Sequence, residues 1–159
     1  MSSILVDTSF LITLADSGRP HHSVAVQYFE EALRRNVPLY LSAIVISEFQ
    51  VKQPITDLPL RNFIVLPFNI DHAMTTGLLM RAVNRDTGDD RVAVKDDLKL
   101  IAQTVCESIT HVLTEDTNTL AKYLQRLREA GECSTKAISL AAGFDAAWLN
   151  NGQGVLPEH

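Results

Sequence analysis

Short apolar runs alternate with longer amphipathic stretches along this chain, and the two patterns predict different elements. Buried strands are typically short apolar runs bounded by polar turn-forming residues, whereas helices place apolar residues three and four positions apart. The apolar runs predict strands at 3–6, 37–41, 63–68 and 110–114. The helical spacing predicts helices at 10–14, 24–35, 73–83 and 119–130, and two more that start at 43 and 97. Polar segments with Gly or Pro predict loops at 16–22, 52–60 and 84–91.

Some helix ends are predicted from residues that commonly cap helices. Ser42 is a good N-cap and favours a helix that starts directly after it, although the β-branched residues that follow would also suit a longer strand. Asp71 and Asp97 are predicted to cap helices, and the helix from Asp97 has the most regular apolar spacing. Gly131 is predicted to end the last helix, because glycine readily adopts the left-handed conformation of helix C-termini.

Strands that alternate with helices imply crossover connections, which join parallel strands. We therefore expect a three-layer α/β/α sandwich with a mainly parallel central sheet. The 159 residues suit one ordinary domain, which we expect to span residues 1–133. Residues 134–159 are expected to form a C-terminal extension that packs its apolar side chains on the domain or on a dimer partner. Its final part, 150–159, is expected to be poorly ordered.

The composition narrows the class of protein. The two cysteines are too few for a disulfide framework, the apolar stretches are too short for a membrane span, and no leader-like segment comes before the first strand. We therefore expect a cytoplasmic protein. The net charge of -5 argues against a protein that holds nucleic acid by bulk electrostatic attraction. It does not exclude a nuclease, because metal-binding acids add negative formal charge that the bound ions cancel.

Acidic residues follow the predicted strands. Asp7 follows the first strand, Glu48 lies on the helix after the second, Glu115 and Asp116 follow the strand at 110–114, and Asp97 heads a helix. Sites in parallel sheets form beyond the carboxyl ends of the strands, so we expect these acids to meet at one edge. Clustered carboxylates repel one another unless cations lie between them, and Mg²⁺ or Mn²⁺ suits such oxygen ligands. Ions held there would assist hydrolysis of a phosphodiester bond.

Four segments of the chain, in this order and spacing, resemble a PIN domain. They are residues 4–11 (ILVDTSFL), 41–49 (LSAIVISEF), 95–102 (KDDLKLIA) and 113–116 (LTED). Each segment alone is common, but the four in order are specific. Together with the entry into the second helix at His22, the resemblance covers roughly residues 3–130.

The resemblance implies a metal-dependent ribonuclease of the VapC-like toxins, which are dimeric and held inactive by an antitoxin. Its substrate would be RNA and its cofactor Mg²⁺ or Mn²⁺. The acidic quartet would be Asp7, Glu48, Asp97 and Asp116. By the same resemblance, Asp7 and Asp97 would bind metal most directly, Glu48 would complete the shell, and Asp116 would hold a second ion or a water. The family has one acid where this chain has two, so Asp96 is the alternative metal ligand to Asp97.

Several neighbouring side chains have both a functional and a simpler interpretation. Thr8 and Thr114 could support the acids by hydrogen bonds. Lys95 and Lys99 could contact RNA phosphate, although lysines near a helix start are usually solvated. The pair at His21 and His22 lacks a spaced third ligand for a transition metal, so we expect it to be loop surface.

The acids have simpler interpretations too. Asp7, Asp97 and Asp116 could each be only a helix cap, and Glu48 only a solvated side chain. The mixed charges at 86–91 are expected to form a solvated turn.

The alternative function is a catalytically inactive PIN-fold module that binds RNA or another protein. The complete acidic quartet argues against it. A phosphoryl-transfer domain of another family is disfavoured, because no Gly-rich phosphate loop follows the first strand.

Overall fold

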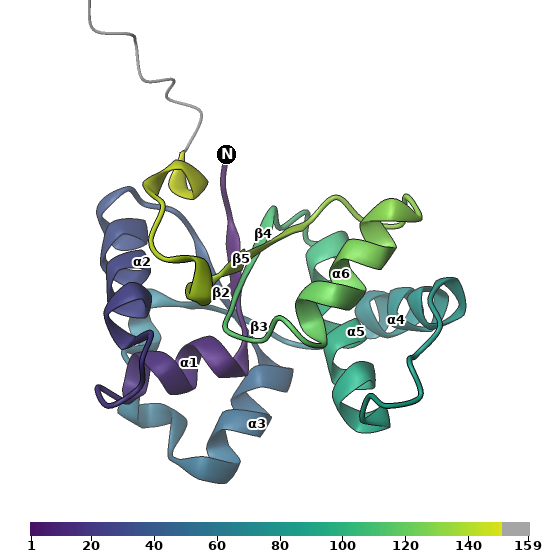
Figure 1. The fold of residues 1–159 in the computed structure, drawn as a ribbon, viewed down its shortest axis with the longest axis horizontal. Helices are drawn as coiled ribbons and strands as arrows, with labels where there is room; N and C mark the ends of the chain where they lie inside the picture. Colours follow the sequence, from purple (N-terminus) through teal and green to yellow (C-terminus); the bar gives the residue numbers. More distant parts are fainter. Residues whose placement is uncertain (151–159) are drawn as a thin grey trace, which may run out of the picture.

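Five parallel strands form one sheet at the centre of the molecule (Figure 1). The structure is a computed structural model, and it describes residues 1–150. The spatial order of the strands is β3-β2-β1-β4-β5, and every neighbouring pair is parallel. The strands are β1 (Ile4–Val6), β2 (Leu39–Ser42), β3 (Ile64–Leu66), β4 (His111–Thr114) and β5 (Lys136–Ser139). The predicted parallel sheet is confirmed, and four of its strands lie where the apolar runs place them.

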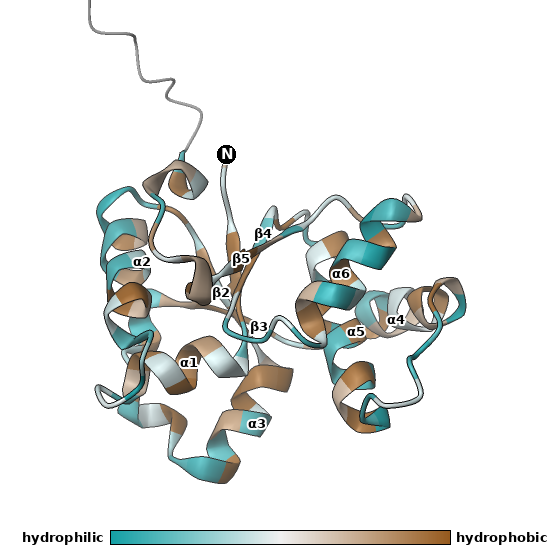
Figure 2. Cartoon of the chain, in the orientation of Figure 1, coloured by the Kyte–Doolittle hydropathy of each residue, from teal (hydrophilic) through white to brown (hydrophobic). Residues whose placement is uncertain are grey.

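Helices cover both faces of the sheet, which confirms the three-layer α/β/α sandwich. In Figure 1, α1 and α2 lie on one side of the strands and α4, α5 and α6 lie on the other. The helices are α1 (Thr8–Ala15), α2 (His22–Arg34), α3 (Ala43–Lys52), α4 (Ile70–Ala82), α5 (Arg91–Cys106) and α6 (Leu120–Glu129). Figure 2 shows the strands largely in the colour of hydrophobic residues, as expected for strands buried on both faces. Among residues 1–150, no helix is both long and apolar enough to cross a membrane.

Two of the predicted helix ends are confirmed. The side chain of Ser42 accepts a hydrogen bond from the backbone N–H of Ile44 at 3.1 Å, so β2 ends at Ser42 and α3 begins directly after it. Gly131 follows α6 with a φ of 75°, a conformation that costs glycine little. Its N–H donates to the carbonyl of Arg128 at 3.0 Å, which satisfies one of the last free carbonyls of the helix.

The predictions for Asp71 and Asp97 as helix caps are wrong. Asn69 caps α4 instead: its side chain accepts a hydrogen bond from the backbone N–H of His72 at 3.0 Å, and the His72 ring accepts one from the N–H of Asn69 at 3.1 Å. Helix α5 starts at Arg91, capped by Asp90, so Asp97 lies within the helix. The sequence analysis missed the first turns of α5 although Val92, Ala93 and Val94 are apolar, because only Val94 of these three is buried and Asp97 offered a second plausible cap.

The charged segment at 86–91 is a mostly exposed turn, as the sequence predicted, and two of its acids are also bonded to α6. The Asp86 carboxylate pairs with Lys122 at 3.0 Å and with Arg126 at 2.7 Å. The Asp89 carboxylate pairs with Lys122 at 2.6 Å and accepts a hydrogen bond from the Tyr123 hydroxyl. These contacts attach the start of α5 to α6 on the same face of the sheet.

The predicted C-terminal extension contributes to the sheet within the described part. β5 pairs with β4 from Lys136 to Ser139, and two 3-10 turns follow, η3 (Leu140–Ala142) and η4 (Ala146–Leu149). Leu149 is fully buried, and the hydroxyl of Ser2 donates to the carbonyl of Trp148 at 3.0 Å. We therefore propose that residues 134–150 belong to the same domain as residues 1–133. The predicted final segment is 150–159, and all of it except Asn150 lies outside the described residues. Two further 3-10 turns, η1 (Ile55–Asp57) and η2 (Leu60–Asn62), occupy the predicted loop between α3 and β3.

Candidate active site

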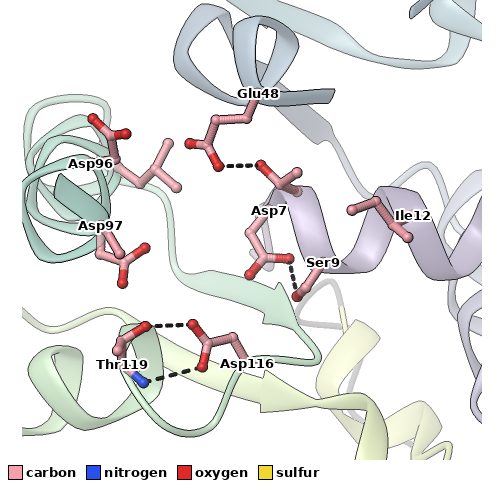
Figure 3. Close-up of a pocket in the computed structure, with 11 residues that line it drawn as sticks. Asp7, Ser9, Ile12, Glu48, Asp96, Asp97, Asp116 and Thr119 are labelled. Atoms are coloured by element: carbon pink, nitrogen blue, oxygen red, sulfur yellow. Dashed lines mark hydrogen bonds between the residues drawn. The ribbon is translucent and has the colours of Figure 1, made fainter. Parts of the chain in front are cut away.

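Acidic side chains from four elements line one cavity of about 260 Å³ at the carboxyl edge of the sheet (Figure 3). Asp7 follows β1, Glu48 lies on α3, Asp96 and Asp97 lie on α5, and Asp116 follows β4. In Figure 3 the carboxylates of Asp7 and Asp97 point into the same space from opposite walls. The topology therefore brings together the predicted acidic quartet and the alternative ligand Asp96. We call this cavity, lined by these five acids, the acidic cavity.

Asp7 is both the cap of α1 and a wall of the acidic cavity. Its carboxylate accepts hydrogen bonds from the backbone N–H of Phe10 and the hydroxyl of Ser9, each at 2.8 Å, and from the hydroxyl of Thr114. Burial raises the pKa of Asp7 to about 6, although these three hydrogen bonds act to lower it. A carboxylate that stays difficult to ionise despite three donors lies in a site that favours an added positive charge.

Asp97 has the least satisfied carboxylate of the site. Its Oδ2 atom is buried and has no hydrogen-bond partner in the described structure. Burial raises the pKa of Asp97 to about 7; Thr119 opposes this rise, and the charges of Asp116, Asp7 and Glu48 add to it. An unpartnered buried oxygen is costly, so this atom is the strongest indication of a missing ligand.

Glu48 and Asp116 have hydrogen-bonded carboxylates. The hydroxyl of Thr8 donates to Glu48 Oε2 at 3.0 Å, and burial raises the pKa of Glu48. Burial would also raise the pKa of Asp116, but the hydroxyl and N–H of Thr119 and the N–H of Asn118 donate to it, and the pKa lies below its usual value. Asp116 is therefore ionised at neutral pH, next to two acids that ionise with difficulty.

The predicted supporting and alternative residues lie close to these acids. Thr8 contacts Glu48 and Thr114 contacts Asp7, as the sequence analysis expected for supporting groups. Asp96 lines the acidic cavity, but Lys99 lies 3.3 Å from its carboxylate and partly neutralises it. Lys95 is exposed and does not line this cavity.

Sequence reasoning missed two hydroxyl groups of the site. Ser9 donates to Asp7, and Thr119 donates to Asp116. A local signal exists for both, because a hydroxyl two or three residues after an aspartate can reach its carboxylate. It is a weak signal, since such pairs are common in ordinary turns.

The expectation that Glu115 joins the other acids is wrong: it does not line the acidic cavity, although it is next to Asp116 in the chain. Its carboxylate accepts hydrogen bonds from the hydroxyl of Thr13 at 2.6 Å and from Arg19 at 2.9 Å, and it lies 2.9 Å from Nδ1 of His21. His21 is therefore partly buried against an acid, which corrects the expectation of plain loop surface. These contacts join the loop after β4 to α1 and to the α1–α2 connection.

A model of the PIN domain matches residues 4–123, which is most of the chain. The chain belongs to the PIN domain family. Solved structures of VapC proteins have the same fold: VapBC2 from Rickettsia felis bound to a promoter DNA fragment matches with a TM-score of 0.57 and 11% identity, over 84% of this chain and 97% of the other.

Two further structures are similar to this PIN domain at comparable levels. VapC20 from Mycobacterium tuberculosis, described as a Sarcin-Ricin loop cleaving toxin, has a TM-score of 0.54 and 19% identity, over 73% of this chain and 92% of the other. DNA-bound VapBC from Salmonella typhimurium has a TM-score of 0.52 and 14% identity, over 88% of this chain and 99% of the other. A search of curated proteins gave no match. At these identities, the likeness to the solved structures concerns the fold.

The donor atoms of this PIN domain fit a hard divalent cation. Within residues 1–150, no three acidic, histidine or cysteine side chains are gathered as a preassembled metal site. Mg²⁺ does not need one, because it usually keeps several waters and takes only one or two carboxylates from the protein. The acidic cavity offers oxygen atoms alone, one of them buried without a partner, and its acids have pKa values that a cation would lower.

Proposed function

We propose that this PIN domain is a Mg²⁺- or Mn²⁺-dependent endoribonuclease that hydrolyses RNA phosphodiester bonds. The observation that carries the proposal is the carboxylate of Asp97. It has a buried oxygen without a partner and a pKa raised to about 7, and it faces Asp7 across a cavity lined with acids. A purely structural site would leave that oxygen hydrogen-bonded or exposed.

Asp7 and Asp97 would hold the metal, Glu48 would complete its shell, and Asp116 would hold a second ion or a water. When bound, the ion supplies a polarised phosphate, an attacking water of lowered pKa and a stabilised leaving oxygen. Asp97 is preferred to Asp96 because Asp96 is paired with Lys99.

The hydroxyl groups around the acids orient them. Ser9 and Thr114 donate hydrogen bonds to Asp7 and so fix the orientation of its carboxylate at the cavity. Thr8 holds Glu48 across the cavity by a hydrogen bond of 3.0 Å. Lys99, which lies beside Asp96, is placed to attract an RNA phosphate toward the acids.

The biological role that we propose is that of a toxin in a toxin–antitoxin pair. The family membership supports a nuclease, and the likeness to VapC20, described as a Sarcin-Ricin loop cleaving toxin, supports RNA as the substrate. The Rickettsia felis and Salmonella typhimurium structures are VapBC complexes, which supports a protein antitoxin as the partner. We further propose a cytoplasmic location, where both RNA and the antitoxin would be met.

We also propose that the protein is a homodimer. Ile70, Met74 and Leu78 follow one another at four-residue intervals on α4 and are 74%, 65% and 62% exposed. A contiguous exposed apolar stripe marks a contact surface, and a stripe on one helix can pair with its own copy about a two-fold axis.

The direct experiment incubates wild-type protein and Asp7→Asn with a mixture of folded RNAs, with Mg²⁺ or Mn²⁺ and with chelator, and sequences the cut ends. The expected result is that only the wild type cleaves RNA, and only when Mg²⁺ or Mn²⁺ is present. RNA binding without cleavage under any condition, together with no metal-dependent rise in melting temperature, would instead support an inactive PIN-fold binding module.

A further inference from the structure

A second cavity, of about 270 Å³, lies between the end of α4 and the first half of α5. Three cations line it: Arg85, Arg91 and Lys95. We call it the basic cavity. On α5, Arg91, Lys95 and Leu98 line the basic cavity, whereas Asp97 and Leu100 line the acidic cavity. At 3.6 residues per turn these two sets lie on nearly opposite sides of the helix.

The charge of the basic cavity is not neutralised by the protein. Among residues 1–150, Arg91 and Lys95 take part in no ion pair, and both are exposed. Arg85 donates hydrogen bonds to the backbone carbonyls of Asp86 and Asp89, which hold its guanidinium in place without an opposite charge. In a chain of net charge -5, three cations without carboxylate partners around one cavity are suited to an anionic ligand.

Apart from Asn84, the remaining lining of the basic cavity is apolar. Met80 and Val83 contribute from the end of α4, and Leu98 contributes from α5. A ligand that matches an apolar surface bordered by cations has a flat or apolar part and an anionic part. A nucleotide has both, because its base can pack on apolar side chains or on a guanidinium plane while its phosphate contacts Arg and Lys.

A row of cations connects the two cavities. Arg91, Lys95 and Lys99 are four residues apart, so each advances by about 40° around α5. The row begins at the basic cavity and ends at Lys99, which lies 3.3 Å from the carboxylate of Asp96 at the acidic cavity. A single strand that followed this row would keep its phosphates on cations from one cavity to the other.

We propose that the basic cavity binds a nucleotide of single-stranded RNA at a position several phosphates away from the bond cleaved at the acidic cavity. The inference rests on the proposed ribonuclease function and adds a substrate subsite to it. The RNA backbone crosses α5 over Lys95 and Lys99, a base packs on Met80 and Val83, and the phosphates contact Arg91 and Lys95.

The test compares RNA binding by the wild type and by the double variant Arg91→Gln/Lys95→Gln. The probe is a fluorescent single-stranded RNA of mixed sequence and roughly 12 nucleotides, within the range of single-strand binding sites. Anisotropy is measured in chelator, so that no RNA is cut, at several salt concentrations. Losing two phosphate contacts is expected to weaken binding about tenfold and to reduce the slope of log K against log salt by about 1.4.

Two further variants control for charge and for folding. Lys52→Gln/Arg61→Gln removes the same net charge from two residues that line neither cavity, and it is expected to leave the affinity within about twofold of wild type. Arg91→Lys/Lys95→Arg keeps the charges and is expected to retain binding. A probe that carries 4-thiouridine should crosslink, on irradiation, to peptides that contain Met80 or residues 91–98.

The outcomes separate this proposal from the proposed function. A wild type that cleaves RNA, combined with a double variant that binds the probe as tightly as the wild type, would overturn the basic-cavity proposal and leave the ribonuclease intact. Equal weakening by the Lys52/Arg61 control would also overturn it, since only net charge would then matter. A wild type that neither binds nor cleaves RNA would overturn both.

Discussion

The hydroxyl of Thr114, at the end of β4, donates a hydrogen bond to the carboxylate of Asp7, which follows β1 and lies 107 residues earlier in the chain. β1 and β4 are neighbours in the sheet, with Val6 opposite Leu113. The bond therefore joins two adjacent strand ends. It opposes the effect of burial, which raises the pKa of Asp7 to about 6.

Replacing Thr114 by valine should make Asp7 harder to ionise. A hydrogen bond to a charged group contributes about 1.5–3 kcal/mol, so its loss should raise the pKa of Asp7 by about one unit or more. The measurement is a carbon NMR titration of the Asp7 carboxyl in chelator. Cleavage should fall about 10- to 100-fold, as is usual when a group that supports a metal ligand is lost. Thr114→Ser keeps the hydroxyl and should behave as wild type, whereas an unchanged pKa in Thr114→Val would refute the role of this bond.

Asp97→Asn should inactivate the enzyme much more than Asp96→Asn. The Asp97 carboxylate has a buried oxygen with no partner, whereas the Asp96 carboxylate already contacts Lys99. We expect a loss of more than about 100-fold for Asp97→Asn, beyond what the loss of a supporting group causes, and less than about tenfold for Asp96→Asn. Both are measured as kcat/KM on one RNA substrate. Equal losses would mean that the two acids share the role.

The stability of the metal-free protein should fall as pH rises from about 5 to 8. The folded-state pKa values of Asp7 and Asp97, about 6 and about 7, lie above the usual value of the unfolded chain. The unfolded chain thus loses these protons first, so the stability present at low pH is lost as pH rises through the folded-state values. Mg²⁺ binds the ionised acids and should raise the melting temperature at pH 8 far more than at pH 5.

The control for this pH dependence is the double variant Asp7→Asn/Asp97→Asn. Its metal-free stability should change much less than that of the wild type over the same pH range, because neither of these two side chains can titrate. Thermal melts in chelator and in MgCl₂ at both pH values provide the comparison. A rise in melting temperature with Mg²⁺ that is the same at pH 5 and pH 8 in the wild type would contradict the assignment.

Glu115→Gln should destabilise the fold at neutral pH. Burial alone would raise the pKa of Glu115, but hydrogen bonds from Thr13, His21 and Arg19 lower it to about 2. The carboxylate therefore contributes stability above its usual pKa, and this contribution is lost as pH falls toward 2. Urea unfolding should show a loss of about 1.5–3 kcal/mol at pH 7 that shrinks in acid. Glu132→Gln changes an exposed acid and should have little effect; a similar loss there would rule out the specific role of Glu115.

Charged substitutions on the exposed face of α4 should dissociate the proposed dimer. Met74→Lys/Leu78→Lys places two charges in the apolar stripe that includes Ile70. Light scattering coupled to size exclusion should give the mass of a dimer for the wild type and of a monomer for this variant. Val51→Lys, at a residue 85% exposed on α3, serves as the matched control and should remain dimeric. A monomeric wild type would exclude the dimer.

The sequence by itself determined four of the five strands of the sheet and the acids at its carboxyl edge. Strand and helix patterns are local, so the apolar runs revealed β1 to β4, and the rule that parallel strands end at one edge placed Asp7 and Asp116 together. The sequence also predicted Ser42 as the N-cap of α3, because an N-cap bonds to residues directly after it in the chain.

Only the tertiary structure decided which atoms of the site lack partners and how α5 is placed. Helix α5 starts at Arg91, where only Val94 among the apolar residues of the first turn is buried, and its beginning depends on the cap at Asp90 and on contacts of the preceding loop with α6. β5 was not predicted either, because Lys136–Ser139 has a polar residue at each end and is not an apolar run, whereas the other edge strand, β3, is entirely apolar. The burial of a side chain, its hydrogen-bond partners and the cavity that each face of α5 lines all depend on segments distant in the chain. Short motifs therefore do not encode them.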